Sequence, residues 1–124
     1  MTGAWRPILA VGAGGAAGTL LRFSLSAYAL EHFAALTFLA TLCANCLGAG
    51  LAGYLVARRL KSLYHAFLVT GFCGGFTTFS FFSLEMLVLF QRAPHWMLAY
   101  AGASITLWLV FATLGHRLGQ PRAA

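Results

Sequence analysis

The chain has 124 residues, of which 60% are hydrophobic and 8% are charged, and its formal net charge is +6 at pH 7. Soluble domains carry about 25% charged residues, so this composition excludes a soluble globular protein and favours one that lies in a membrane. The arginines lie mainly near the ends of apolar segments, as expected of cationic side chains that reach the membrane surface. We therefore expect no nucleic-acid partner.

Four long apolar segments follow one another along the chain. They cover about residues 8–30, 34–57, 66–90 and 96–115, and each meets or approaches the roughly 20 residues that cross the hydrocarbon core. The first is not typical of a cleaved signal peptide, because only Arg6 precedes it and three further segments follow. The sequence therefore predicts an all-α, multi-pass protein of the cell membrane, in which residues 1–124 form a single integral membrane domain.

The first segment combines glycines with one arginine. Gly12–Ala17 matches the loose glycine pattern of dinucleotide-binding loops. That loop needs a soluble strand–turn–helix unit, so we interpret these glycines as packing positions. The spacing of Gly14 and Gly18, and that of Gly71 and Gly75 in the third segment, predicts faces where another helix approaches closely. Arg22 lies in the second half of the segment, where a charge costs at least about 2.5–3.5 kcal/mol, so it either serves function or pairs with a neighbouring group.

Polar residues one helical turn apart mark the second and fourth segments. Asn45 lies at the centre of the second segment, with Thr41 one turn before it, and Tyr100 and Ser104 repeat this spacing in the fourth. The amide of Asn45 offers two N–H donors without a charge, which suits weak and reversible binding of an anion.

The three cysteines all fall inside apolar segments. Cys43 and Cys46 have the spacing of redox and zinc sites, but no further cysteine or histidine ligand lies nearby in the sequence. We expect these two residues and Cys73 to be small buried side chains that pack between helices.

The third segment carries the most informative stretch, Gly71–Ser83. Gly74-Gly75 is where a helix would break most easily, and a break inside the membrane frees carbonyl oxygens that need partners. An ion is the leading candidate for that partner. After the break, Phe79 and Phe82 fall on one helical face, with Thr78 and Glu85 at its margin. The positive edges of two phenyl rings can contact an anion without offering it a charge.

Cationic residues are distributed unevenly between the two sides of the predicted bundle. One side carries six, the other only Arg92 together with Glu31 and His32. The positive-inside rule therefore predicts that both termini lie in the cytoplasm. The six residues are Arg6, Arg58, Arg59, Lys61, Arg117 and Arg122.

The sequence Gly71-Phe-Cys-Gly-Gly-Phe-Thr-Thr-Phe-Ser-Phe-Phe-Ser-Leu-Glu85 closely resembles the signature of the CrcB/Fluc fluoride channels. Gly14–Gly18 followed by Arg22 resembles the first-span motif of that family. Thr41–Gly48 resembles its second-span motif, and Tyr100–Ser104 its fourth. The length and the four-span layout agree as well.

The resemblance implies a passive, fluoride-selective channel that exports fluoride and lowers its concentration in the cytoplasm. It implies an antiparallel, dual-topology homodimer in lipid with two separate pores and a structural sodium ion at its centre. The sodium would be held by backbone carbonyls at the break, which here belong to Gly74 and Thr77 of each subunit.

The same resemblance assigns roles to side chains. Phe79 and Phe82 would line the pore through their ring edges, with Asn45 as a donor beside them. Further polar contacts would come from Thr41, Tyr100 and Ser104. Residues that support the pore or its entrances would be Arg22, Glu85, Thr78, Ser80 and Ser83.

Two features of this chain depart from the family pattern. Phe81 stands where the family usually has threonine, which removes one hydroxyl from the third segment. The cationic bias is also stronger than a chain that inserts in both orientations would favour. The dimer is therefore either an antiparallel homodimer or a heterodimer with an oppositely oriented paralogue, and both remain open.

Two other classes of function compete with a fluoride channel. Proton-coupled exporters of the small multidrug resistance type are also four-span antiparallel dimers, but they depend on a carboxylate in the middle of span one, where this chain has only Arg22. A non-transporting assembly subunit would explain neither Asn45 nor the glycine pair. We expect no enzymatic activity, because the sequence shows no nucleophile–base arrangement and no cluster of metal ligands.

Overall fold

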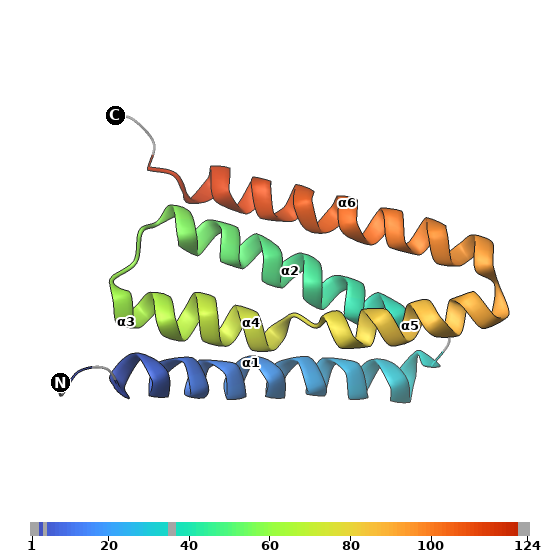
Figure 1. Cartoon of the computed structure of the whole chain (residues 1–124), viewed down its shortest axis with the longest axis horizontal. Helices are drawn as coiled ribbons and strands as arrows, with labels where there is room; N and C mark the ends of the chain where they lie inside the picture. The colour runs from blue at the N-terminus through green and yellow to red at the C-terminus, as the bar shows by residue number, and fades with distance from the viewer. Residues whose placement is uncertain (1–2, 4, 35–36, 122–124) are drawn as a thin grey trace.

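The computed structural model describes residue 3 and residues 5–34 and 37–121. The four long helical stretches lie nearly along one axis in an elongated bundle, and successive stretches run in opposite directions, so both ends of the chain lie at the same end of the bundle (Figure 1). The elements are α1 (Trp5–His32), α2 (Thr37–Ala57), α3 (Ser62–His65), the π-helix η2 (Ala66–Cys73), α4 (Gly74–Phe76), α5 (Phe79–Arg92) and α6 (Pro94–Gly119).

Four stretches of the described chain are helical, long and apolar enough to cross a membrane: Trp5–His32, Thr37–Ala57, Ser62–Arg92 and Pro94–Gly119. The prediction of four spans in an all-helical protein is confirmed. Three of the four helical stretches extend a few residues beyond both predicted limits. The second helix begins at Thr37, three residues after the predicted start. Residues 35–36 of the predicted second span and Arg122 of the predicted cationic side lie outside the described residues.

The four spans associate as two close pairs, α1 with the third span and α2 with α6 (Figure 1). Glycines permit both contacts. A Cβ atom on Gly14 would collide with the carbonyl oxygen of Phe67, and one on Gly18 with that of Phe72. On the other pair, a Cβ atom on Gly115 would collide with the carbonyl oxygen of Gly50. The interpretation of Gly14 and Gly18 as packing positions is therefore confirmed, since any larger residue would force the backbones apart.

The third span is interrupted after the double glycine and not at it. Gly74 has helical dihedral angles, φ −63° and ψ −37°, and Gly75 lies within α4. Thr77 (φ −80°, ψ 157°) and Thr78 (φ −147°, ψ 123°) are extended, and α5 starts at the next residue. The predicted position of the break is therefore wrong. Gly75 is required instead for close approach, because a Cβ atom there would collide with the carbonyl oxygen of Gly15 on α1.

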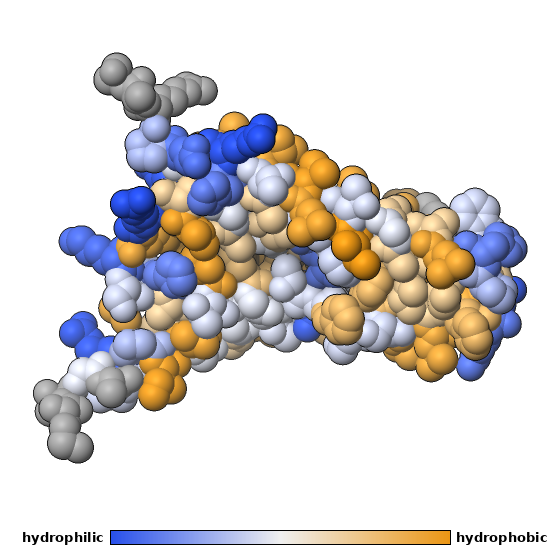
Figure 2. Space-filling model, turned by 45° about the horizontal axis from the view of Figure 1, so that its top comes forward, coloured by the Kyte–Doolittle hydropathy of each residue, from blue (hydrophilic) through white to orange (hydrophobic). Residues whose placement is uncertain are grey.

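The buried core of one subunit is small and lies where α2, α5 and α6 meet. Phe82 and Asn45 are each 6% exposed, and Ser104 is fully buried. Most other large apolar side chains are exposed, and they form a broad apolar belt between two hydrophilic ends (Figure 2). Such a surface suits lipid or another subunit and does not suit water.

Candidate functional site

The interruption of the third span is held open by Asn45 of α2. The Asn45 Nδ2 group donates a hydrogen bond to the carbonyl oxygen of Thr78 (2.9 Å), and the Thr78 amide donates to Asn45 Oδ1 (2.7 Å). The side-chain amide thus bonds to both backbone polar groups of Thr78, its N–H and its C=O. One N–H of Nδ2 is not used in this pair. The sequence analysis predicts that Asn45 is a donor for an anion, and this stays a prediction. In the structure, the Asn45 side chain holds the backbone at the break through its two hydrogen bonds with Thr78.

Gly48, one turn after Asn45, makes room for the same break. A Cβ atom on Gly48 would collide with the Cγ2 methyl group of Thr77. The Thr77 hydroxyl in turn donates to the carbonyl oxygen of Cys73 (3.0 Å), which ends the first half of the span. Asn45 and Gly48 therefore act together, one on each of the two extended residues.

Residues of α1 occupy one of the carbonyl oxygens that the break frees. The carbonyl oxygen of Gly75 accepts hydrogen bonds from Thr19 Oγ1 and from Arg22 Nε, both at 3.3 Å. The Arg22 guanidinium also lies 5.5 Å from the centroid of the Phe81 ring, within the range of a cation–π contact. Arg22 thus stabilises the carboxyl end of the first half-helix, where a cation is favourable. Phe81, the departure from the family pattern, provides part of its surroundings.

Two further carbonyl oxygens, those of Gly74 and Thr77, lose their usual helical donors. In a continuous helix they would accept from the amides of Thr78 and Phe81. The Thr78 amide donates to Asn45 instead, and the Phe81 amide donates to Thr78 Oγ1 (3.2 Å). Carbonyl oxygens released in this way are the ligand type that a hard cation prefers. One chain supplies too few of them for a coordination shell, so a complete site needs oxygens from a second copy.

Phe79 and Phe82 lie next to each other, with ring centroids 5.7 Å apart and planes inclined by 48°. Their surroundings differ. Phe82 is buried against α6, with its centroid 5.6 Å from that of Tyr100 and 4.9 Å from that of Trp108. Phe79 is 72% exposed. A closed pathway between the two rings therefore needs a wall from outside this subunit on the side of Phe79.

Buried donors without acceptors lie beside Phe82. Within residues 5–34 and 37–121, Ser104 Oγ and Trp108 Nε1 are covered from solvent and have no hydrogen-bond partner. Trp108 also lines a cavity of about 230 Å³ with Asn45, Ala49, Thr77, Thr78 and Phe79. The sequence analysis identified Ser104 but missed Trp108. The one available signal was its position one further turn along the face that carries Tyr100 and Ser104.

The carboxyl group of Glu85 accepts hydrogen bonds from two of the predicted pore hydroxyls, those of Thr41 and Tyr100. Thr41 Oγ1 donates to Glu85 Oε1 and the Tyr100 hydroxyl donates to Oε2, each at 2.6 Å. The hydroxyls expected to face an anion are thus bound to a carboxyl group in this structure. Thr41 and Glu85 line a cavity of about 680 Å³ between α1, α2 and α5, which Phe38, Phe81 and Arg92 also line.

The other predicted polar residues form local contacts. Ser80 Oγ lies 3.2 Å from Thr78 Oγ1, and Ser83 Oγ donates to the carbonyl oxygen of Phe79 (2.9 Å). Of the cysteines, Cys46 and Cys73 are buried as expected, whereas Cys43 is exposed, so the prediction of a buried Cys43 is wrong.

Comparison with known proteins identifies the family. A sequence model of the family described as CrcB-like protein, Camphor Resistance (CrcB) matches residues 9–116. The chain belongs to the CrcB family. The resemblance found in the four spans is thereby confirmed.

Several relatives of this CrcB protein carry the name of a channel. The chain is 39% identical over 112 residues to fluoride-specific ion channel FluC 2 of Bacillus subtilis, covering 90% of this chain and 86% of the relative. It is 37% identical over 121 residues to fluoride-specific ion channel FluC of Azobacteroides pseudotrichonymphae, covering 93% and 97%. A relative in Proteus mirabilis with the same name is 40% identical over 107 residues, which cover 78% of this chain and 82% of the relative. The relatives are ion channels and not enzymes, and with its four spanning helices this CrcB protein is a multi-pass membrane protein.

Proposed function

We propose that this CrcB protein is a passive, fluoride-selective channel that exports fluoride across the cell membrane. The observation that carries the proposal is that two buried donors of α6, Ser104 Oγ and Trp108 Nε1, have no acceptor among the described residues. Trp108 lies against Phe82 and lines one cavity with Asn45 at the interrupted third span. The names of the relatives, which are fluoride-specific ion channels, support the choice of ion.

In the proposed pathway, the anion passes between the edges of Phe79 and Phe82 and loses water in stages. The spare N–H of Asn45 and the hydroxyl of Ser104 replace part of its hydration, and the positive ring edges replace more. These are neutral and weak contacts, so they hold the anion without trapping it. Chloride is excluded mainly by the width of a pathway so closely lined by aromatic rings.

The Glu85 cluster lies at one mouth of this pathway. Tyr100 contacts both Phe82, through its ring, and Glu85, through its hydroxyl. If the carboxyl group is displaced by rotation of its side chain, the hydroxyls of Thr41 and Tyr100 become available to an anion. We therefore assign the two hydroxyls to the pathway, and Glu85 to its entrance. Arg22 supports the pathway by stabilising the broken helix, and Thr78, Ser80 and Ser83 shape the start of α5.

We propose an antiparallel dimer with two pores, one along each side of the subunit boundary. The exposed Phe79 ring supports this arrangement, since a second copy would supply the missing wall. The alternative is a heterodimer with an oppositely oriented paralogue. Relatives numbered 1 in Listeria monocytogenes and 2 in Bacillus subtilis are compatible with paired genes. In the orientation that the cationic bias favours, both termini lie in the cytoplasm.

A structural sodium ion fits the backbone at the break. The carbonyl oxygens of Gly74 and Thr77 would hold it, together with the same oxygens of a second copy, because the amides that would otherwise bond to them donate elsewhere. When bound, the ion supplies positive charge that offsets the buried carbonyl dipoles at the centre of the dimer. These backbone groups fit that role, and no step of conduction passes through the ion.

Purified protein in liposomes tests the proposal. Liposomes loaded with fluoride or with chloride are opened to potassium with an ionophore, and anion efflux is followed with ion-selective electrodes. We expect rapid fluoride efflux and background chloride efflux, both without a proton gradient. Equal efflux of the two anions would contradict selectivity, and fluoride efflux that needs a proton gradient would favour a proton-coupled exporter. Glu85→Gln is informative there, because Glu85 is the acidic side chain away from the span ends, whereas Glu31 lies at the end of α1.

A further inference from the structure

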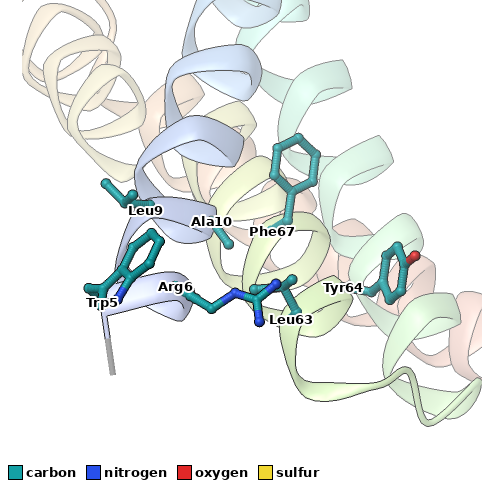
Figure 3. Close-up of a pocket in the computed structure, with 7 residues that line it drawn as sticks. All are labelled: Trp5, Arg6, Leu9, Ala10, Leu63, Tyr64 and Phe67. Carbon is teal, nitrogen blue, oxygen red and sulfur yellow. The ribbon is translucent and has the colours of Figure 1, made fainter. Parts of the chain in front are cut away.

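A groove separates the first turns of α1 from α3 and the start of η2. It has a volume of about 450 Å³, and it lies far from Asn45 and the break, at the end of the bundle that holds both chain ends (Figures 1 and 3). Its lining is apolar and aromatic apart from one guanidinium group. The lining residues are Trp5, Arg6, Leu9, Ala10, Leu63, Tyr64 and Phe67.

Arg6 is the charged group of this groove. Its side chain extends from α1 toward Leu63, with Trp5 and Leu9 on one side and Phe67 on the other (Figure 3). Trp5 and Tyr64 have the amphipathic side chains that are enriched where a protein meets the lipid headgroups. Charged and aromatic side chains of this kind face the interface between hydrocarbon and water, so the groove lies at the depth of the headgroups.

No acidic side chain of the subunit can neutralise Arg6. The chain has two, Glu31 and Glu85. Glu31 lies near the other end of α1, about 37 Å away at 1.5 Å per residue, and Glu85 is bound by Thr41 and Tyr100. Further cations, Arg58, Arg59 and Lys61, lie in the connection between α2 and α3, which is at the same end of the bundle (Figure 1). No described carboxylate therefore pairs with Arg6, which is exposed, so an anion from outside the subunit can bind it.

We propose that this groove binds an anionic phospholipid, with its phosphate on Arg6 and an acyl chain against Leu9, Leu63 and Phe67. A soluble phosphate would leave the apolar walls uncovered, and a zwitterionic lipid would bring an ammonium group to an end of the bundle that already carries several cations. A molecule that carries both a negative headgroup and a long apolar chain satisfies both parts of the groove. Basic pockets between membrane-spanning helices are known to select such headgroups.

Quenching of tryptophan fluorescence by brominated lipids tests this proposal in the full-length protein. The protein in neutral detergent is titrated with phosphatidylglycerol or phosphatidylcholine that carry the same brominated acyl chains. The signal of Trp5 is obtained as the difference between the wild type and Trp5→Phe. We expect Trp5 to be half-quenched at about a fivefold lower concentration of phosphatidylglycerol, as one cation near the lipid surface predicts.

Variants of single cations assign that preference to Arg6. Arg6→Gln should remove it, Arg6→Lys should keep most of it, and Arg117→Gln, at the same end of the bundle but outside the groove, should leave it unchanged. Equal quenching by both lipids in the wild type, or a preference that survives Arg6→Gln, would overturn the proposal. Absence of quenching by either lipid would also overturn it and would indicate that a second copy covers the groove. These outcomes do not depend on fluoride conduction.

Discussion

Asn45 and Thr78 form a reciprocal pair of hydrogen bonds, of 2.9 and 2.7 Å, across the contact between α2 and the third span. This pair gives the Thr78 amide an acceptor in place of the Gly74 carbonyl, and it gives the Thr78 carbonyl a donor from α2. In an apolar interior each such group would otherwise cost about 1–3 kcal/mol. The residue that we propose as an anion donor is therefore also the residue that fixes the shape of the pathway.

Replacing Asn45 should affect both stability and conduction. Asn45→Ala leaves the buried Thr78 amide without its acceptor and removes a donor to the Thr78 carbonyl, and we expect a loss of about 1–3 kcal/mol in stability and fluoride efflux at background. Asn45→Asp keeps an acceptor for the Thr78 amide but removes the donor. It should retain more stability than Asn45→Ala while conducting no better.

Thermal unfolding in detergent and efflux from liposomes measure these two effects. Cys46→Ala, at the next buried position on α2, is the matched control. It should change stability little and leave efflux intact. Wild-type efflux from Asn45→Ala would show that the amide neither binds the anion nor shapes its route.

Isoleucine substitutions separate the roles of the two phenylalanines. Phe82→Ile removes a buried ring, so we expect a loss of about 1–3 kcal/mol in stability as well as efflux reduced at least tenfold, which corresponds to about 1.4 kcal/mol. Phe79→Ile alters a side chain that is mostly exposed in one subunit. It should leave the stability of the subunit nearly unchanged and still slow efflux severely.

Phe90→Ile provides the control for this pair, because Phe90 is an exposed phenylalanine of the same helix away from the site. Efflux and the elution volume in size-exclusion chromatography should match those of the wild type. If Phe79→Ile and Phe90→Ile conduct equally, the ring edge of Phe79 has no part in permeation.

The two adjacent glycines of the third span should respond oppositely to alanine. A Cβ atom on Gly75 would collide with the carbonyl oxygen of Gly15, whereas one on Gly74 has nothing within 4 Å in the subunit. Gly75→Ala should therefore separate α1 from the third span and cost about 1–3 kcal/mol. Gly74→Ala should be neutral or stabilising, since alanine is the better helix former.

Thermal unfolding of the two variants measures this difference at adjacent positions of one helix. Equal loss of stability would contradict the close contact with α1. A loss confined to Gly74→Ala would indicate that a second copy, and not α1, approaches this face.

The indole N–H of Trp108 should respond to fluoride. It is buried next to Phe82 and has no acceptor among the described residues, so an anion beside Phe82 lies within its reach after a small movement. We expect the NMR resonance of the Trp108 indole N–H proton to shift when fluoride is added, and to shift little with chloride. The signals of Trp5 and Trp96 should not move.

Trp108→Phe and Trp96→Phe assign the signals and provide a matched pair for efflux. Trp96 is 63% exposed at the start of α6, so its replacement should leave efflux unchanged, whereas Trp108→Phe should reduce it several-fold. A Trp108 signal that is insensitive to fluoride would show that this N–H is only a strained packing feature.

The sequence alone predicted the four spans, because long apolar runs are a local property that composition and length determine. It also predicted the glycine contact of α1, because the spacing of Gly14 and Gly18 is visible in the chain. The position of the break was predicted incorrectly. Gly75 serves helix packing, and the break lies at the extended pair Thr77-Thr78. The break at Thr77-Thr78 depends on contacts with Asn45 and Gly48, which lie far away in the sequence.

The candidate site was predictable as a set of residues but not as a set of contacts. Of the predicted residues, Phe82 and Tyr100 are in contact, and Asn45 and Phe79 line one cavity. Sequence spacing could not indicate that Thr41 and Tyr100 bind the two oxygens of Glu85, because these residues come from three helices. It could not distinguish the buried Phe82 from the exposed Phe79 either, since burial depends on how α5 lies against α6.

The reversal potential of currents through purified protein in a planar bilayer tests the central claim most directly. Opposed gradients of fluoride and chloride, with equal pH and equal cations on both sides, give the two anions equilibrium potentials of opposite sign. The account predicts a current that reverses at the fluoride equilibrium potential and disappears in Phe82→Ile. Reversal near the chloride potential, or at zero, would contradict a passive and fluoride-selective pathway.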